Sequence, residues 1–515
     1  MGKIIETTID NFGRGITNAV RSKNTRLARS IQNFDILSAE GKLIPNFDSE
    51  ADGSTGDTEQ LCLFLTLGTT QANTKQYALG IQGSGSSRPK VFERASIPTG
   101  AWSGSTSGIV TTGGARSEKV FVAYNDATND LIFGLSTTNG IWEYNVTGAS
   151  ITDQRVSLTF TDSAQGLVHS KSDILYIPYD NKIASKNGAA AFNTTALTLP
   201  RHTVITRIAE WGNYLVITTR PKYIGGKSTI YLWDQDSTLT TLSEKIDWGN
   251  EDIEFIEEVD GYLVGISKTS ATSVVKKPKI LFKYALGSGT KKFLEFDATN
   301  VTILFGNNIQ KQNSRLYFLM SVEIDSTRQM GLWSIGRNAE GEFSLFMDRM
   351  LDNGTTTFTA SDAPLGFQLL GDYLTVAYKV GSTYTIRRTD DDGYTATSFY
   401  ESLIFNAGDG SLKKDLKGIT VMHQPLPTVG QVVVKYKKDA ESSFTTILTS
   451  STDNTISESA VNIQSSGTPL PKGYKEIQFR MESTGNAIIT GLSFQEDVVG
   501  GRIYQAIWEF IKSFI

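Results

Sequence analysis

The stretch GDYLTVAYKVGSTYTIRR, from Gly371 to Arg388, contains the pattern that decides the fold. Apolar and aromatic residues alternate with polar ones on both sides of a Gly-Ser pair, as in two antiparallel strands joined by a tight turn. Closely similar first strands occur upstream, since VFVAY at 120–124 and LYIPY at 175–179 differ little from LTVAY at 374–378. The chain therefore contains a repeated hairpin.

This hairpin occurs seven times, with first strands centred on Tyr77, Val120, Leu175, Leu215, Leu263, Leu316 and Leu374. The centres lie 40 to 58 residues apart, and short apolar segments before and after several hairpins bring each repeat to about four strands. The segments that follow the last two hairpins are EFSLFMD at 342–348 and SFYESLIF at 398–405. Blades of β-propellers have this strand number and length. A β-sandwich is the competing fold, but it requires no such repeat. We therefore predict a propeller of about seven blades, within a range of six to eight.

The segments on either side of the repeats predict three further parts of the chain. Residues 1–58 are polar and basic with few periodic apolar positions, which indicates an extended N-terminal arm before a propeller at 59–411. Alternating apolar and polar residues predict a β-sandwich at 412–498. Apolar residues spaced three and four apart predict a short amphipathic helix at 499–515. The predicted fold class is all-β.

Composition narrows the range of partners. The chain has 515 residues and a formal net charge of −5, which argues against tight neutralisation of nucleic-acid phosphates but permits passive contact with DNA. Its one cysteine, Cys62, excludes an intramolecular disulfide. A run of about 18 apolar residues would be needed for a membrane span, and none occurs.

No motif in the sequence identifies a catalytic or metal site. The three histidines, His169, His202 and His423, lack metal-ligand spacing, and phosphate-binding loops and nucleophile elbows are absent. We therefore expect no catalytic residue, no metal, no cofactor and no enzymatic activity.

Two residue classes leave alternatives open. Carboxylates in or near predicted turns, at Asp390–Asp392, Glu257–Glu258 and Asp234 with Asp236, could hydrolyse a glycoside but are favoured as solvated turns. Trp211, Trp233, Trp248 and Trp333 could stack on a host-surface glycan but are favoured as packing between blades. A receptor-binding adhesin thus remains the alternative function, and a glycoside hydrolase a weaker one.

The start of the chain resembles the tail nozzle, or tail tubular, proteins of tailed bacteriophages. The resemblance rests on Asn11, Phe12, Gly15 and Ile16, then on Asn33 with Phe34, and then on Gly41, Lys42, Leu43 and Pro45. In that family the propeller has a structural role in a ring of subunits around the channel through which DNA is ejected. The resemblance implies a structural virion protein of a nozzle, hub or tail tip, assembled in the bacterial cytoplasm.

The partners implied are further copies of this chain and neighbouring tail proteins. We expect the arm and the terminal helix to make the contacts between subunits. The candidate contact residues are Phe12, Arg14, Ile16, Arg21, Arg26, Phe34, Ile503, Ile507, Phe510 and Phe514.

Overall fold

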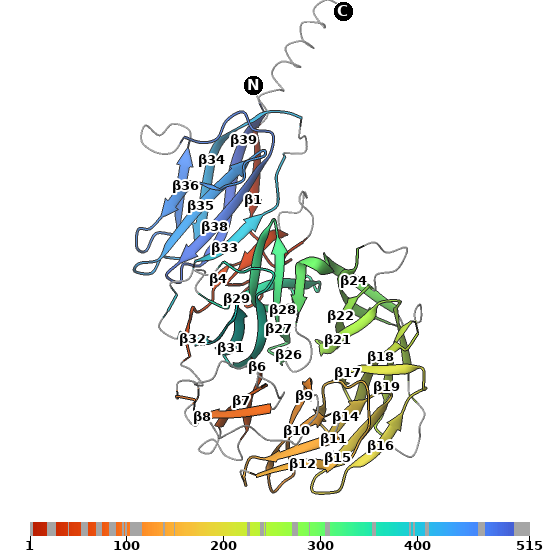
Figure 1. Ribbon diagram of the computed structural model, residues 1–515. Helices are drawn as coiled ribbons and strands as arrows, with labels where there is room; N and C mark the ends of the chain where they lie inside the picture. Colours follow the sequence, from red (N-terminus) through yellow and green to blue (C-terminus); the bar gives the residue numbers. More distant parts are fainter. Residues whose placement is uncertain are drawn as a thin grey trace, which may run out of the picture. The chain divides into compact units, whose positions relative to one another are not determined.

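A computed structural model gives the fold of most of the chain (Figure 1). The residues outside its description are 1–3, 18–26, 40, 53–59, 68–74, 82–88, 95–96, 98–99, 103–115, 137–139, 149, 224–226, 237–241, 243, 270–276, 288, 304–308, 353–356, 391–392, 395–396, 407–410, 462–468 and 499–515. The predicted C-terminal helix lies wholly in this last range. Within the described residues there is no α-helix, only a 3-10 turn, η2 (Ala298–Asn300), so the all-β prediction is confirmed.

The chain divides into two compact units. Unit 1 comprises Met1–Ser49, Leu332–Thr356 and Asp390–Ile515, and unit 2 comprises Glu50–Gly331 and Thr357–Thr389. Strand β28 (Thr327–Arg337) has residues in both. The four predicted parts of the chain therefore correspond to two units, each assembled from separate stretches of sequence.

Unit 2 is built from small antiparallel sheets whose strands mostly follow one another in the chain. The first three sheets are β6 (Gln60–Leu67), β7 (Lys75–Ile81) and β8 (Pro89–Arg94); β9 (Arg116–Asn125), β10 (Asp130–Ser136), β11 (Gly140–Asn145) and β12 (Ser150–Val156); and β13 (Leu167–His169), β14 (Ile174–Tyr179), β15 (Lys182–Asn187) and β16 (Asn193–Thr198).

The next sheets continue this order. They are β17 (Thr203–Trp211), β18 (Tyr214–Pro221), β19 (Ser228–Trp233) and β20 (Glu244–Gly249); β21 (Asp252–Val259), β22 (Tyr262–Lys268), β23 (Lys279–Leu286) and β24 (Gly289–Asp297); and β30 (Ala363–Leu370), β31 (Tyr373–Val380), β32 (Thr383–Thr389) and β5 (Ser49–Ala51). The strands β25 (Val301–Ile303), β26 (Ile309–Gln312) and β27 (Arg315–Ile324), which lie between them in the chain, belong to a ten-stranded sheet that also contains β28.

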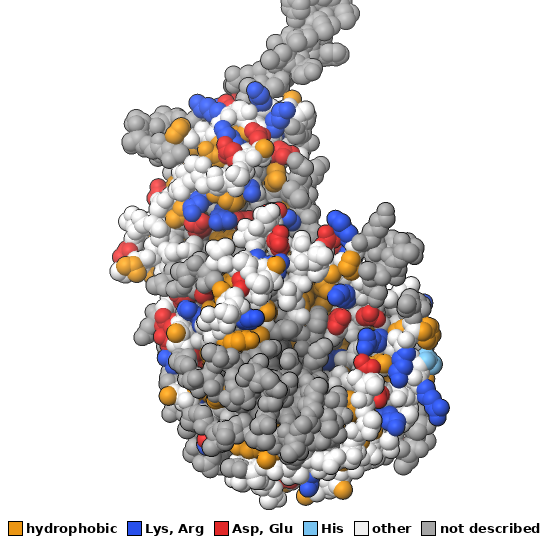
Figure 2. All heavy atoms as spheres, in the orientation of Figure 1, with side chains coloured by type: hydrophobic (Ala, Val, Ile, Leu, Met, Phe, Trp, Pro, Cys, Tyr) orange, Lys and Arg blue, Asp and Glu red, His pale blue; other side chains and the backbone are white. Residues whose placement is uncertain are grey.

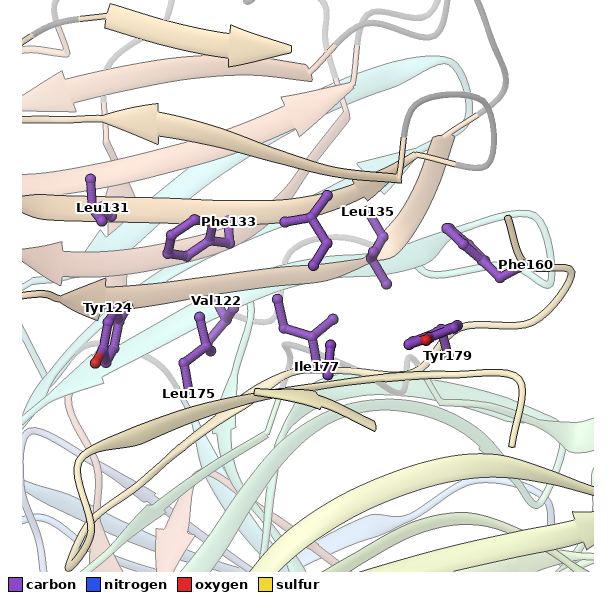
Figure 3. Packing of buried hydrophobic residues seen from close by; sticks show 11 residues of the cluster. Val122, Tyr124, Leu131, Phe133, Leu135, Phe160, Leu175, Ile177 and Tyr179 are labelled. Atoms are coloured by element: carbon purple, nitrogen blue, oxygen red, sulfur yellow. The ribbon is translucent and has the colours of Figure 1, made fainter. Parts of the chain in front are cut away.

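The hydrophobic core of unit 2 lies between neighbouring sheets. Figure 3 shows Phe133 and Leu135 of one sheet facing Leu175 and Ile177 of the next, and all four side chains are buried. Similar clusters join the third sheet to the fourth and the fourth to the fifth. The sheet of β7 packs against both the sheet of β10 and the sheet of β31. Contacts between neighbouring sheets run from β6 through β9, β13, β17, β21, β27 and β30 and return to β6.

Unit 1 contains a two-sheet sandwich. One sheet has the order β1 (Ile4–Ile9), β39 (Ile489–Val498), β34 (Lys414–His423) and β37 (Ser457–Val461). The other includes β29 (Phe343–Met350), β2 (Ala28–Gln32), β33 (Ser398–Ser402), β38 (Ile477–Thr484), β35 (Gln431–Lys438) and β36 (Thr445–Ser450). The rings of Phe479 and Phe494, one from each sheet, lie 4.7 Å apart between centroids. A small ladder joins β3 (Phe34–Asp35) to β4 (Ile44–Pro45).

Two strand assignments differ from the pattern expected from the sequence. The segments EFSLFMD and SFYESLIF, expected as outer strands of the last two repeats, form β29 and β33 in unit 1. The fourth place in the last sheet of unit 2 is taken by β5, which precedes the first repeat in the chain. The N-terminal segment, expected as an extended arm, contains strands that are built into both units.

Candidate functional site

A cavity of about 310 Å³ opens in unit 2 where the first strands of successive sheets begin. Its walls are the N-terminal parts of β17 and β21 and the segment before β13, with Arg220 contributed by β18. The charged side chains that line it are Asp162, Arg207, Arg220, Asp252 and Glu254. Figure 2 shows acidic and basic side chains interspersed on the visible face of unit 2.

Two walls of the cavity contain β-bulges. The register of β17 against β18 shifts between Ile205 and Arg207, so that Thr206 is the extra residue. The register of β21 against β22 shifts in the same way around Glu254. Bulges change the direction of side chains near functional sites. Both extra residues line the cavity, and β6 and β30 carry bulges early in the strand as well.

Hydrogen bonds hold the third wall in place. The backbone N–H groups of Thr161 and Asp162 donate to Oδ1 of Asp180 at 3.0 and 2.9 Å. Burial opposes ionisation of Asp180, but these hydrogen bonds outweigh it and hold the pKa of that carboxyl below its ordinary value. The amide of Gln165 donates to the carbonyl of Phe121 at 2.5 Å. The segment that carries Asp162 is therefore ordered by its own contacts.

One ion pair stands at the open side of the cavity. Nη2 of Arg220 lies 3.0 Å from Oδ1 of Asp162, and the side chains are 45% and 36% exposed. Solvated pairs of this kind contribute little to stability. Both side chains can therefore exchange this contact for one with a ligand.

A second pair lies deeper. Nη2 of Arg207 is 4.0 Å from Oε2 of Glu257, and the Arg207 guanidinium lies 5.4 Å from the ring centroid of Phe255. Burial raises the pKa of Glu257 to about 7, although Arg207 and Lys311 act to lower it. Arg207 lines the cavity, whereas Glu257 does not.

The other carboxylates singled out from the sequence do not join this group. Oδ1 of Asp234 accepts the backbone N–H of Asp236 at 3.1 Å, as in an ordinary turn. Glu258 pairs with Lys311, Asp390 belongs to unit 1, and Asp391 and Asp392 lie outside the described residues. Within the described part of the chain, no group of three or more His, Cys, Asp or Glu side chains is arranged to hold a metal ion.

The tryptophans and histidines are explained by packing and internal hydrogen bonds. Trp233, Trp248 and Trp333 are almost fully buried, and Trp211 donates to the carbonyl of Gly261. His169 lies 3.0 Å from the amide of Gln235, and His423 lies 2.9 Å from the hydroxyl of Ser450. The rings of His202 and Tyr223 lie 6.2 Å apart between centroids and are tilted relative to each other.

The candidate subunit-contact residues that the structure describes lie within unit 1. Phe12 and Phe34 are fully buried, Ile16 is 5% exposed, and Arg14 pairs with Glu340 at 2.5 Å. Arg21, Arg26, Ile503, Ile507, Phe510 and Phe514 lie outside the described residues. Contact with a second subunit therefore stays a prediction for all of these residues.

The sequence analysis missed the charged residues of the cavity. Arg207 and Arg220 stand in one sheet, Glu254 in the next, and Asp162 in the segment before β13, and no local motif connects them. A shift of one residue in strand pairing sets the direction of the Thr206 and Glu254 side chains. Such a shift cannot be recognised from the alternation of apolar and polar residues in the sequence.

Comparison with known proteins gives neither a family nor a relative. No family model matches the sequence, and no curated protein matches it. Three solved structures are similar in part. An exo-β-1,3-galactanase from Phanerochaete chrysosporium is 9% identical, with 87% of this chain and 99% of that chain covered and a TM-score of 0.32. A puromycin-hydrolysing peptidase from Mycobacterium tuberculosis is 10% identical, with 70% and 60% covered and a TM-score of 0.41. A glycoside hydrolase is 8% identical, with 86% and 99% covered and a TM-score of 0.28.

The expectation that this chain is not an enzyme is corrected by these matches. The structures that are similar in part are those of a galactanase, a peptidase and a glycoside hydrolase. At these identities and TM-scores the matches assign no activity to it. Among the described residues, no helix is long and apolar enough to cross a membrane.

Proposed function

We propose that this protein is a structural subunit of a tailed-bacteriophage virion and that unit 2 is a seven-bladed β-propeller. The observation that carries the proposal concerns the segment that resembles tail nozzle proteins. Its apolar positions Phe12, Ile16, Phe34 and Leu43 are all 5% exposed or less. The residues shared with that family are thus the ones on which the framework of unit 1 depends.

The glycines and the asparagine of the resemblance have structural reasons of their own. Gly15 has a φ of +70°, and a Cβ there would lie 2.6 Å from the carbonyl oxygen of Leu345. Asn33 has a φ of 57°, and its amide donates to the hydroxyl of Ser398 at 3.2 Å. Such backbone positions strongly favour glycine and, less strongly, asparagine. A shared framework accounts for these residues better than chance similarity does.

The blade number rests on the order of contacts in unit 2. Among the described residues, seven strands contact one another in sequence and return to the first: one from each of six small sheets, and β27 from the ten-stranded sheet. The last sheet is completed by β5 from the N-terminal side. Closure of a ring by strands from both ends of the repeat region leaves only short protected edges, as in propellers.

The proposed partners are copies of this chain, arranged as a ring around the DNA channel, and adjoining tail proteins. Purified full-length protein, examined by sedimentation velocity and negative-stain electron microscopy at about 1 and about 100 μM, should form rings at the higher concentration by mass action. Replacing Ile503, Ile507, Phe510 and Phe514 together by Ser should shift the protein toward monomer.

Ile456→Ser, at a 63% exposed position in unit 1, is the matched control and should leave assembly unchanged. A protein that stays monomeric at the higher concentration, with its termini intact, would refute the ring. Equal effects of the quadruple and control variants would remove the C-terminal segment from the interface.

A further inference from the structure

The cavity at the start of β17 and β21 has walls that are already formed. The wall that carries Asp162 is fixed by Asp180, and the other walls are strands in ladders with bulges at Thr206 and Glu254. Its volume, about 310 Å³, is at the lower end of the range of roughly 300 to 1,000 Å³ for small-molecule sites. A ligand of modest size could bind there without a rearrangement of the backbone, which lowers the entropic cost of binding.

The charges of the lining select the kind of ligand. Three carboxylates and two guanidinium groups line the cavity as the structure describes it. A strongly anionic ligand would face the carboxylates of Asp162, Asp252 and Glu254, and a strongly cationic one would face Arg207 and Arg220. A neutral ligand that both donates and accepts hydrogen bonds can satisfy both kinds of group.

Hydroxyl groups on adjacent carbons match this arrangement. Carboxylate oxygens accept from hydroxyls, and the planar guanidinium donates to them in a fixed fork. At the open side, Asp162 and Arg220 lie 3.0 Å apart, so one pair of adjacent hydroxyls can contact both. Because these side chains are partly solvated, the loss of their mutual contact is a small penalty.

We propose that this cavity is a binding site for a neutral, hydroxyl-rich ligand of the size of one or two sugar rings. Asp162 and Arg220 contact adjacent hydroxyls at the open side, and Glu254 accepts from a further hydroxyl on the wall of β21. Arg207, held by Glu257 and Phe255, supplies a donor deeper in the cavity. The site is independent of the structural role proposed above.

The test uses the full-length protein and a glycan array that contains neutral and acidic members. The strongest neutral binder is then titrated by calorimetry against wild type, Arg220→Ala and Asp162→Asn. Each variant should weaken binding about tenfold to hundredfold, because a hydrogen bond with a charged group is lost. Arg220→Lys keeps the charge but not the fork and should fall between wild type and Arg220→Ala.

The matched control is Lys227→Ala. Lys227 pairs with Asp247 at 3.0 Å in the same unit, but neither residue lines the cavity. Lys227→Ala should bind the glycan as tightly as the wild type does. Circular dichroism of each variant establishes that it is folded before titration.

Three results would overturn the site. They are the absence of neutral binders on the array, binding by acidic glycans or spermidine in their place, and binding that is unchanged in both Arg220→Ala and Asp162→Asn. None of these results bears on ring formation, so the failure of this proposal is distinguishable from failure of the structural one.

Discussion

Unit 2 holds two arginine–carboxylate pairs that differ in almost every physical respect. Nη1 of Arg94 lies 2.8 and 2.9 Å from the two oxygens of Asp52, and both side chains are at most 3% exposed. Arg207 reaches Glu257 over 4.0 Å beside an open cavity. Both carboxyls have a raised pKa because they are buried, although their arginines oppose the effect.

Further hydrogen-bond partners surround the Arg94–Asp52 pair, which we call the sealed pair. Arg94 also donates to Gln76 at 2.6 Å and to Thr375 at 3.0 Å, and Trp102 donates to Asp52 at 3.1 Å. These residues bring together the first sheet, the last sheet and the residue that follows β5. A buried charge pair with its hydrogen bonds satisfied specifies one arrangement of its surroundings. We infer that the sealed pair defines how the ring of sheets closes. The Arg207–Glu257 pair, which we call the open pair, instead supports a residue of the cavity wall.

The largest expected effect comes from removal of the sealed arginine. Arg94→Met removes the nearest countercharge of the buried Asp52, whose other arginine, Arg388, is 4.0 Å away, and should lower the free energy of unfolding by about 3 to 5 kcal/mol. The measurement is urea unfolding followed by tryptophan fluorescence. Arg207→Met should cost less, because Glu257 can take up a proton near neutral pH.

A pair whose arginine is exposed provides the control for both variants. Arg155 is 48% exposed and lies 3.2 Å from Glu143. Arg155→Met should change the free energy of unfolding by less than about 1 kcal/mol. If Arg94→Met and Arg155→Met lowered stability equally, the closure role of the sealed pair would be wrong.

The pH dependence of the free energy of unfolding should report the ionisation of Glu257 in the open pair. In the folded protein Glu257 keeps its proton up to about pH 7, whereas its ordinary pKa is 4.5. Between these values the unfolded chain releases this proton and the folded chain does not, so the contribution to the free energy of unfolding falls as pH rises. Above about pH 7 the contribution stays level.

Glu257→Gln removes this titration. Between about pH 5 and about pH 8, the wild type should lose roughly 2 kcal/mol of stability relative to the variant, since one pKa unit corresponds to about 1.4 kcal/mol. Paired urea titrations at both pH values measure the difference. A wild-type-minus-variant difference that stays constant with pH would show that Glu257 has an ordinary pKa.

The two pairs also show what the sequence could reveal. Hairpins were predictable because both strands and their turn are adjacent in the chain, as in β31 and β32, where Val380 pairs with Thr383. Asp52 lies 42 residues before Arg94, and the partner strand of β5 lies over 330 residues away. Pairing at such separations has no local pattern, which is why SFYESLIF was expected to take the place that β5 occupies.

The smallest expected effect on stability belongs to the residue at the open side of the cavity. Arg220→Ala removes a solvated pair with Asp162, so the free energy of unfolding should change by less than about 1 kcal/mol. Urea unfolding under the conditions used for Arg94→Met gives the comparison. If Arg220→Ala is stable but has lost ligand binding, Arg220 contributes to ligand binding, whereas Arg94 contributes to the stability of the fold. A loss of several kcal/mol would instead make Arg220 part of the framework, and the contrast between the sealed and open regions would fail.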